Sequence, residues 1–179
     1  MNTLFPVESM YPQGFQYLPG FITMQEEADL LKVIANLQLH TFQFQGYEAK
    51  RRVASFGYDW SFEKQQLSKG KDTPKEFDGL VEEVAKTLFL QQNDFAELLV
   101  TEYPAGAVIN WHRDAPPFKL IAGISLNSDC TFKLRPHDKR DQGKKSLLSL
   151  TVQRRSLYVM QDEARNEWQH SIAPVQAVR

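Results

Sequence analysis

The sequence has a single cysteine, no long apolar run and almost no net charge. Cys130 stands alone among 179 residues, which excludes an internal disulfide framework and a zinc finger built on cysteines. No apolar run approaches the roughly 18 residues that a membrane-spanning helix needs. Residues 1–13 lack a basic stretch followed by an apolar one, which argues against a secretory signal. We therefore expect a cytoplasmic protein with no membrane partner.

The length and composition are those of one globular domain. Hydrophobic residues make up 42% and charged residues 24% of the chain, values that argue against wholesale disorder. A chain of this length fits one core, whereas two independent domains would be cramped. We expect a single domain over residues 1–179, with a helical part at about 14–92 and a β-rich core at about 93–179. The sequence leaves the oligomeric state open, and a monomer is our expectation.

The net charge of −1 hides a strong asymmetry. Segment 133–155 carries eight basic and two acidic residues, so it is +6 and the remainder is −7. Such asymmetry favours a polyanionic partner. A solvated hairpin that protects strand edges from aggregation is the other interpretation. The basic residues are Lys133, Arg135, Lys139, Arg140, Lys144, Lys145, Arg154 and Arg155.

A second basic cluster, Lys50–Arg52, precedes three aromatic residues, Phe56, Tyr58 and Trp60. Basic side chains interleaved with aromatic ones suit phosphate contact and base stacking. They equally suit an ordinary strand with two alternating faces. Arg51, Arg52 and the three aromatic residues are therefore candidates for substrate contact.

The N-terminal half predicts two helices among strands. Thr23 and Glu26 form a capping-box pattern ahead of a helix that runs from about Gln25 to Leu37. A second helix is predicted to begin at Thr73–Pro74, with Thr73 as its cap. The other expected segments are strands at Phe15–Phe21, Thr41–Phe44 and Arg51–Trp60, a turn at Gly46 and a mobile loop at Gln65–Asp72.

The C-terminal half predicts short strands separated by turn residues, which is typical of a sandwich, jelly roll or barrel. Pro104–Gly106 fits a tight hairpin, with proline second and glycine fourth in the turn. We therefore expect a mainly β fold with two N-terminal helices packed on one sheet. The predicted strands are Glu97–Tyr103, Ala107–His112, Leu120–Leu126, Thr131–Arg135, Ser146–Val152 and Ser156–Met160.

His112 and Asp114 stand at the end of a predicted strand, and His170 follows the last one. Residues two apart on a strand share one face, so His112 and Asp114 project together. Two imidazoles and one carboxylate make the facial triad of non-heme Fe(II) oxygenases. On spacing alone, ordinary surface or core positions for these three residues are as compatible with the sequence as a metal site is.

The segment Thr101–Asp114 resembles the N-x-Y-x-x-G-x-x-x-x-x-H-x-D signature of the AlkB family, which are Fe(II)- and 2-oxoglutarate-dependent dioxygenases. The resemblance extends in the expected order over nearly the whole chain. Its other parts are Arg51–Val53, Phe56–Tyr58, Ile124–Leu126, Arg155–Met160, Glu163–Arg165 and His170–Ile172.

The resemblance implies a double-stranded β-helix, or jelly roll, flanked by two helices. It implies that Fe(II) is held by His112, Asp114 and His170, with O₂ and 2-oxoglutarate as the other reactants. Tyr103 matches the tyrosine that hydrogen-bonds the cosubstrate, and Arg179 matches the arginine that pairs with its distal carboxylate. Two further residues are candidates for the cosubstrate pocket, Thr101 and Ser125.

Three features depart from the family pattern. Thr101 replaces the asparagine of the bacterial prototype, and Arg51 stands near its base-stacking tryptophan. Family members continue with a second arginine, whereas this chain stops at Arg179, so we expect a truncated C-terminus. Arg165, in the region 163–165, is a candidate for orienting a ligand or a substrate phosphate, with a structural salt bridge as the alternative.

The resemblance implies oxidative demethylation of N-alkylated bases in DNA or RNA, as in dealkylation repair, on a base that is single-stranded or flipped out. An oxygenase that acts on a protein side chain or a small molecule is an alternative. A catalytically degenerate jelly-roll binding module is a second alternative, which the intact His112, Asp114 and His170 disfavour.

Overall fold

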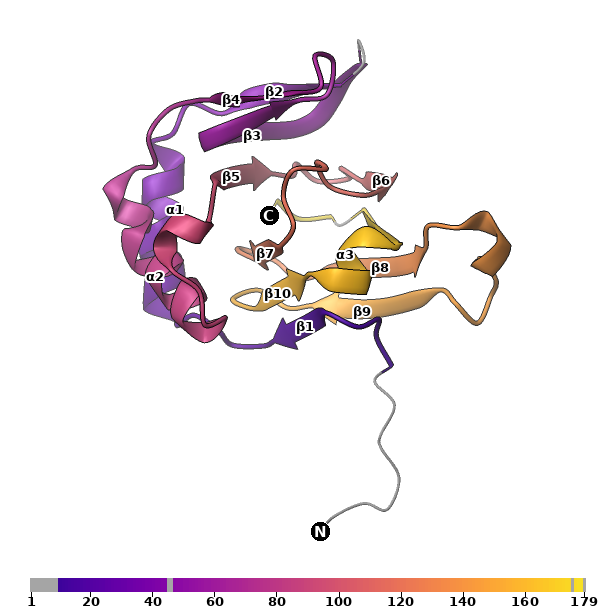
Figure 1. Ribbon diagram of the computed structural model, residues 1–179. Helices are drawn as coiled ribbons and strands as arrows, with labels where there is room; N and C mark the ends of the chain where they lie inside the picture. The colour runs from indigo at the N-terminus through magenta and orange to yellow at the C-terminus, as the bar shows by residue number, and fades with distance from the viewer. Residues whose placement is uncertain (1–9, 45–46, 175, 179) are drawn as a thin grey trace.

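Antiparallel sheets build most of the fold, with two longer helices along one side (Figure 1). The computed structural model describes residues 10–44, 47–174 and 176–178. The strand orders are β1-β10-β7, β6-β11-β8-β9 and β2-β3-β4, and β5 also pairs with β3. The strands are β1 Phe15–Leu18, β2 His40–Phe44, β3 Tyr47–Ser61, β4 Gln66–Lys69, β5 Glu97–Glu102, β6 Ile109–His112, β7 Ile121–Ile124, β8 Cys130–Pro136, β9 Leu148–Val152, β10 Leu157–Met160 and β11 Trp168–Ile172.

The main core lies between the sheets β1-β10-β7 and β6-β11-β8-β9. Strand β8 shows why: Cys130, Phe132 and Leu134 alternate with less buried residues, as expected for a strand with one face turned inward. They pack with Val152 of β9 and Met160 of β10, so side chains of both sheets share one cluster. This arrangement of two facing sheets confirms the predicted jelly roll.

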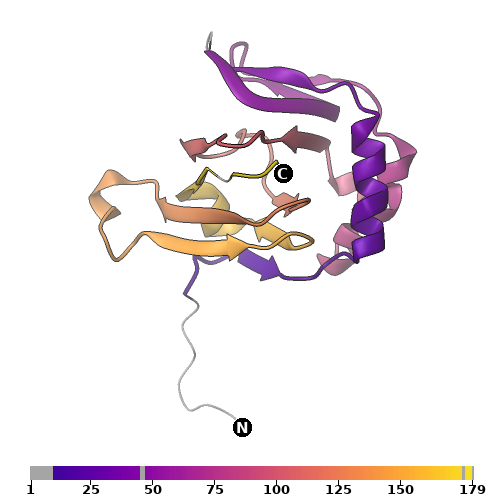
Figure 2. The same ribbon diagram turned by 180° about the vertical axis from the view of Figure 1, so that it is seen from behind.

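Helix α1 (Met24–Ala35) begins at the predicted capping box. The Thr23 amide donates to the Glu26 carboxylate at 2.7 Å, and the Glu26 amide donates to Thr23 Oγ1 at 3.2 Å. Helix α2 (Asp78–Thr87) lies beside α1, and both cover one side of the sheets (Figure 2). Leu30 of α1 packs with Ile22 and Phe77, against partly buried residues of β5 and β7.

A buried carboxylate joins α1 to the C-terminal half. Glu27 is 2% exposed and accepts hydrogen bonds from Arg154 (2.7 Å), Arg155 (3.1 Å) and the Asn127 amide (2.8 Å). Burial raises the pKa of Glu27, but the hydrogen bonds from Arg154, Asn127 and Arg155 outweigh that effect and lower it overall. Two of the eight basic residues of segment 133–155 are therefore paired with a carboxylate of the protein itself.

Two predictions for residues 65–77 are wrong. The expected mobile loop contains strand β4, which pairs with the end of β3 and is exposed along its length. An exposed strand needs no hydrophobic alternation, so its polar composition imitates a loop. Thr73 does not cap the second helix: a 3₁₀ turn at Lys75–Phe77 comes first and buries Phe77, and α2 starts after it without a side-chain cap.

The predicted hairpin at Pro104–Gly106 is also corrected. The Ala107 amide donates to the Pro104 carbonyl at 2.9 Å, so the turn starts at Pro104 and Gly106, with φ +75°, is its third residue. The flanking strands β5 and β6 pair with different partners, so the turn carries the chain from one sheet to another. The predicted turn at Gly46 lies outside the described residues.

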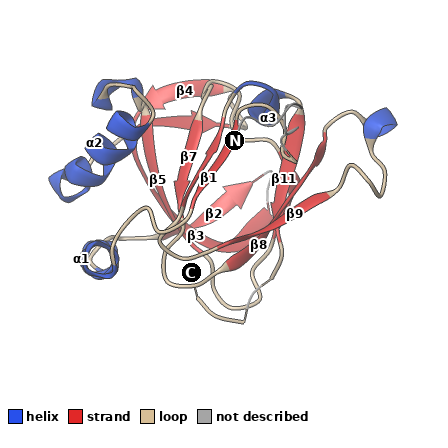
Figure 3. Cartoon of the chain, turned by 90° about the horizontal axis from the view of Figure 1, so that it is seen from below, coloured by secondary structure: helices blue, strands red, loops and turns tan. Residues whose placement is uncertain are grey.

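The sequence prediction missed β11 and the short helix α3 (Asp162–Asn166) that precedes it. Figure 3 shows the strands surrounding the middle of the molecule, with α1 and α2 on one outer side. The mainly β fold with flanking helices is confirmed. Among the helices of the described residues, none is both long and apolar enough to cross a bilayer.

Candidate active site

Antiparallel pairing of β6 and β11 brings the predicted metal ligands together. His112 ends β6 and stands directly opposite His170 in the register of the two strands. Asp114 follows His112 by two residues, just past the strand. One ligand atom from each of the three side chains lies within 4.8 Å of the others. The constellation expected from the sequence is therefore present in the fold.

The carboxylate of Asp114 faces a ring nitrogen of both imidazoles. Asp114 Oδ1 is 3.8 Å from His112 Nε2, and Asp114 Oδ2 is 3.8 Å from His170 Nε2. The two imidazole rings are tilted, with their centroids 4.1 Å apart. The Phe132 ring stacks nearly parallel on the His170 imidazole, with the ring centroids 5.3 Å apart. Separations of 3.8 Å are longer than hydrogen bonds, and they leave room for a metal ion between the carboxylate oxygens and the imidazole nitrogens.

Both imidazoles can offer a lone pair to a metal. His112 Nδ1 lies 2.8 Å from the Asn110 carbonyl oxygen, to which it donates a proton, so Nε2 is left as the acceptor that faces Asp114. Burial lowers the pKa of His170 to about 4, against the opposing effect of Asp114. His170 is therefore neutral at physiological pH, which is the form that binds a metal.

An orphaned oxygen gives an independent indication of a cation. Asp114 Oδ2 is buried and is the one such side-chain oxygen or nitrogen without a hydrogen-bond partner in the part of the chain that the structure describes. A buried carboxylate oxygen without a partner is costly unless a cation compensates it. Two neutral imidazoles and one carboxylate fit a divalent iron ion and leave its other coordination positions for small ligands.

Arg165 anchors the segment that carries Asp114. The side chain is 5% exposed and donates from Nε to the Phe118 carbonyl (2.9 Å) and from Nη2 to the carbonyls of Ala115 (2.6 Å) and Asp114 (3.2 Å). Arg113 adds a bond to the Asn166 carbonyl at 2.7 Å. Neither of the alternatives weighed for Arg165, a ligand contact or a salt bridge, describes these contacts; its donors hold backbone oxygens.

A cavity of about 2410 Å³ opens beside the metal ligands. It is larger than a pocket for one small molecule, so it has room for a cosubstrate and part of a larger substrate. Three of the predicted cosubstrate residues line it, namely Thr101, Tyr103 and Ser125. Arg179, the fourth, lies outside the described residues.

The substrate candidates of β3 divide between its two faces. Arg51 lines the cavity with Val53 and Ser55, which alternate along one face, whereas Arg52 points the other way and pairs with Glu102 at 2.6 Å. The three aromatic candidates alternate with the face of Arg51, but they lie further along the strand, where residues of both faces line the cavity. Phe56 is buried, Tyr58 is 44% exposed and Trp60 is half-buried.

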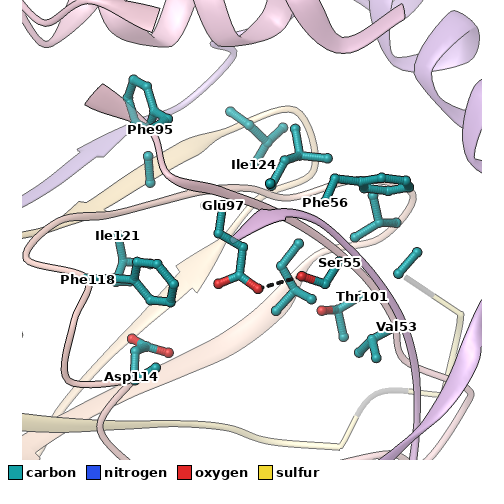
Figure 4. Close-up of a pocket in the computed structure, with 18 of the residues that line it drawn as sticks. Val53, Ser55, Phe56, Phe95, Glu97, Thr101, Asp114, Phe118, Ile121 and Ile124 are labelled. Atoms are coloured by element: carbon teal, nitrogen blue, oxygen red, sulfur yellow. Dashed lines mark hydrogen bonds between the residues drawn. The ribbon is translucent and has the colours of Figure 1, made fainter. Parts of the chain in front are cut away.

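Sequence reasoning missed one cavity residue, Glu97. It begins β5, four residues before Thr101, and its carboxylate accepts a hydrogen bond from Ser55 Oγ at 2.8 Å. Figure 4 shows the carboxylate pointing into the cavity above Asp114, beside Phe118. The alternation of a strand was the available signal, since residues 97 and 101 share a face with the site. A lone glutamate at a strand start carries no motif.

Two curated proteins are similar to this chain over most of its length, and one of them is much longer than this chain. The chain is 27% identical over 165 residues to the uncharacterized protein L905 of Acanthamoeba polyphaga mimivirus. The match covers 90% of this chain and 73% of the viral protein. The chain is 28% identical over 170 residues to the mouse (Mus musculus) tRNA (carboxymethyluridine(34)-5-O)-methyltransferase ALKBH8. That match covers 91% of this chain but only 24% of the mouse protein.

Solved structures share the fold, among them the following two. The structure of OsALKBH1 superposes with a TM-score of 0.69 at 14% identity, covering 92% of this chain and 87% of the other. A prolyl-4-hydroxylase of Pseudomonas putida superposes with a TM-score of 0.60, also at 14% identity, covering 93% and 88%. The model of the 2OG-Fe(II) oxygenase superfamily matches residues 14–178. The chain therefore belongs to the 2OG-Fe(II) oxygenase superfamily, and its cofactor and cosubstrates are Fe(II), 2-oxoglutarate and O₂.

Proposed function

We propose that this oxygenase, as a single domain, demethylates N-alkylated bases in DNA or RNA. The observation that carries the proposal is the joining of two features in one cavity: the His112–Asp114–His170 site and the face of β3 that presents Arg51. An extruded base would enter this cavity while its phosphates stay outside. The name of the mouse relative refers to tRNA, which supports including RNA among the substrates.

The residues of the chain divide the work. His112, Asp114 and His170 would hold Fe(II). When bound, Fe(II) with 2-oxoglutarate and O₂ would supply the hydroxylation of a C–H bond, and a hydroxylated N-methyl group then releases formaldehyde. Arg165 keeps the Asp114 segment in place. Tyr103, Thr101 and Ser125 would contact the cosubstrate, and the cavity walls exclude water from the reacting carbon.

Basic residues would hold the nucleic acid backbone. Lys139, Lys144 and Lys145 are exposed near the end of the hairpin between β8 and β9, which extends away from the rest of the molecule in Figure 1. Phosphate contacts of this kind weaken as salt rises. We propose, too, a cytoplasmic location, which the single free cysteine, Cys130, supports.

The experiment measures formaldehyde and succinate release with Fe(II), 2-oxoglutarate and single-stranded oligonucleotides that carry one methylated base each. We expect release above the rate without substrate for at least one methylated base, and none for the unmethylated sequence. His112→Ala is the matched negative control. Release that never exceeds the rate without substrate, in a protein that binds Fe(II) and 2-oxoglutarate, would refute the nucleic acid proposal.

A second candidate is an oxygenase for a protein or small-molecule substrate. The observation in its favour is that several arginines of the basic segment already have partners within the chain. Arg154 and Arg155 bind Glu27, and Arg135 lies over the Trp111 ring at 4.4 Å. Binding of a short single strand that does not weaken as salt rises would favour this candidate over the first.

A further inference from the structure

Glu97 is a carboxyl group placed inside the cavity with few partners. In the register of the sheet it lies opposite Gly57, and its Oε1 accepts a hydrogen bond from Ser55 Oγ at 2.8 Å. Among the described residues this is the one hydrogen bond of the Glu97 side chain, and no cationic side chain there forms an ion pair with it. Oε2 is therefore left to accept from a group inside the cavity.

The surroundings of Glu97 do not compensate a negative charge. Burial raises the pKa of Glu97, Ser55 opposes this, and the nearby carboxylates of Asp59 and Asp114 raise it further. Phe118, Ile121 and Phe95 are apolar neighbours in the same cavity (Figure 4). A carboxyl group in such surroundings costs stability, which is the usual mark of a functional group.

The position of Glu97 relates it to the reacting group. Glu97 and Thr101 lie on the same strand and face, and Figure 4 shows the Glu97 carboxylate pointing toward Asp114 from the cavity wall. A substrate that presents its oxidised carbon to the metal site would place its neighbouring ring atoms against this wall. A carboxyl group recognises ring N–H donors and positive charge, and it disfavours acceptor oxygens.

We propose that Glu97 is a specificity-determining residue that selects substrates carrying an N–H donor or a positive charge beside the oxidised carbon. This inference rests on the proposed function, because it takes the substrate to be an N-methylated base. Two such bases make a matched pair. 3-Methylcytosine is cationic with an exocyclic amino group, whereas 3-methyluracil carries the same methyl group but is neutral and has a carbonyl oxygen in place of the amine.

The test compares kcat/KM for the two bases in one single-stranded oligonucleotide sequence, in the wild-type protein and in Glu97→Gln. We expect the wild type to prefer 3-methylcytosine, and Glu97→Gln to lower that preference about ten- to hundredfold, since glutamine can still accept a hydrogen bond but has lost the negative charge that favours a cationic base. Glu83→Gln removes an exposed carboxylate of α2 away from the cavity and serves as the control with an unchanged preference.

The outcomes separate this inference from the proposed function. Turnover with an unchanged preference in Glu97→Gln overturns the role of Glu97 alone. Absence of turnover of both bases by the wild type, with Fe(II) and 2-oxoglutarate bound, overturns the proposed function and this substrate assignment with it. If Glu97→Gln does not fold, Ser55→Ala replaces it, because it removes the hydrogen bond that orients the Glu97 carboxylate and favours its charged form. An unchanged preference in that variant counts against the inference, and a smaller preference supports it.

Discussion

Replacing Arg165 by methionine removes the donors that hold the Asp114 segment while keeping a side chain of similar length. Three carbonyl oxygens lose their partner. The Ala115 oxygen is buried with its donor, and losing a charged donor there costs about 2 kcal/mol. The oxygens of Asp114 and Phe118 are part-buried, so water can replace the guanidinium at a cost of about 1 kcal/mol each. The segment is thereby destabilised by about 4 kcal/mol.

That loss falls on metal binding as well as on folding. Asp114 must be ordered before it can act as a ligand, so the energy needed to order the segment is subtracted from metal affinity. Loss of a group that orients a ligand typically lowers metal affinity ten- to hundredfold. We expect Arg165→Met to bind cobalt(II), a spectroscopic substitute for Fe(II), at least about tenfold more weakly than the wild type. The assay is a titration followed by the visible absorbance of cobalt.

Two variants separate positioning from general stability. Arg165→Lys keeps the positive charge but offers fewer donors in a different geometry, so its cobalt affinity should lie between those of wild type and Arg165→Met. Arg113→Met removes an exposed side chain that donates to the Asn166 carbonyl, so it should change cobalt affinity little. If Arg165→Met melts at a lower temperature but, while folded, binds cobalt as tightly as wild type, the reasoning about Asp114 is wrong.

Three further variants test the site and the core. His112→Ala should abolish turnover and leave the melting temperature close to that of wild type, since a ligand at a strand end carries little of the core; global unfolding, seen by circular dichroism, would make it structural. Glu27→Ala should lower the free energy of unfolding by about 2 kcal/mol in urea titrations, because Arg154 and Arg155 lose their buried partner. Because the folded pKa of Glu27 is lowered, its contribution is present above the unfolded pKa and lost as pH falls through the folded pKa, so wild type and Glu27→Ala should converge in stability in acid. Gly123→Ala should cost about 1–3 kcal/mol, since its new Cβ would overlap the Tyr158 ring that crosses the glycine; an unchanged melting temperature would show that the ring can move freely.

The local part of the metal site could be predicted from the sequence. His112 and Asp114 are two residues apart at a strand end, so their common direction follows from the geometry of an extended chain. The place of His170 opposite His112 could not be derived in that way, because it depends on the pairing of strands distant in the sequence. The resemblance to a family supplied that step, and β11 itself was not among the predicted strands.

The side chains that support the site were harder to predict than its ligands. Arg165 was expected to contact ligand, phosphate or carboxylate, whereas in the fold it binds carbonyl oxygens, a use of arginine that leaves no trace in the charge pattern. A contact of Arg165 with the substrate stays a prediction. Glu97 had no motif at all, and only the register of β5 against β3 places it in the cavity.

The charge asymmetry of the sequence changes meaning once side chains have positions. Arg154 and Arg155 belong to the +6 segment, yet both neutralise Glu27, which belongs to the negative remainder. Arg140 likewise pairs with Asp138. A count along the chain assigns these charges to one surface, whereas the fold cancels them locally. The exposed lysines of the hairpin stay available to a polyanion, so each of them replaced by glutamine should reduce the salt dependence of nucleic acid binding, whereas replacement of Arg154 should reduce stability instead.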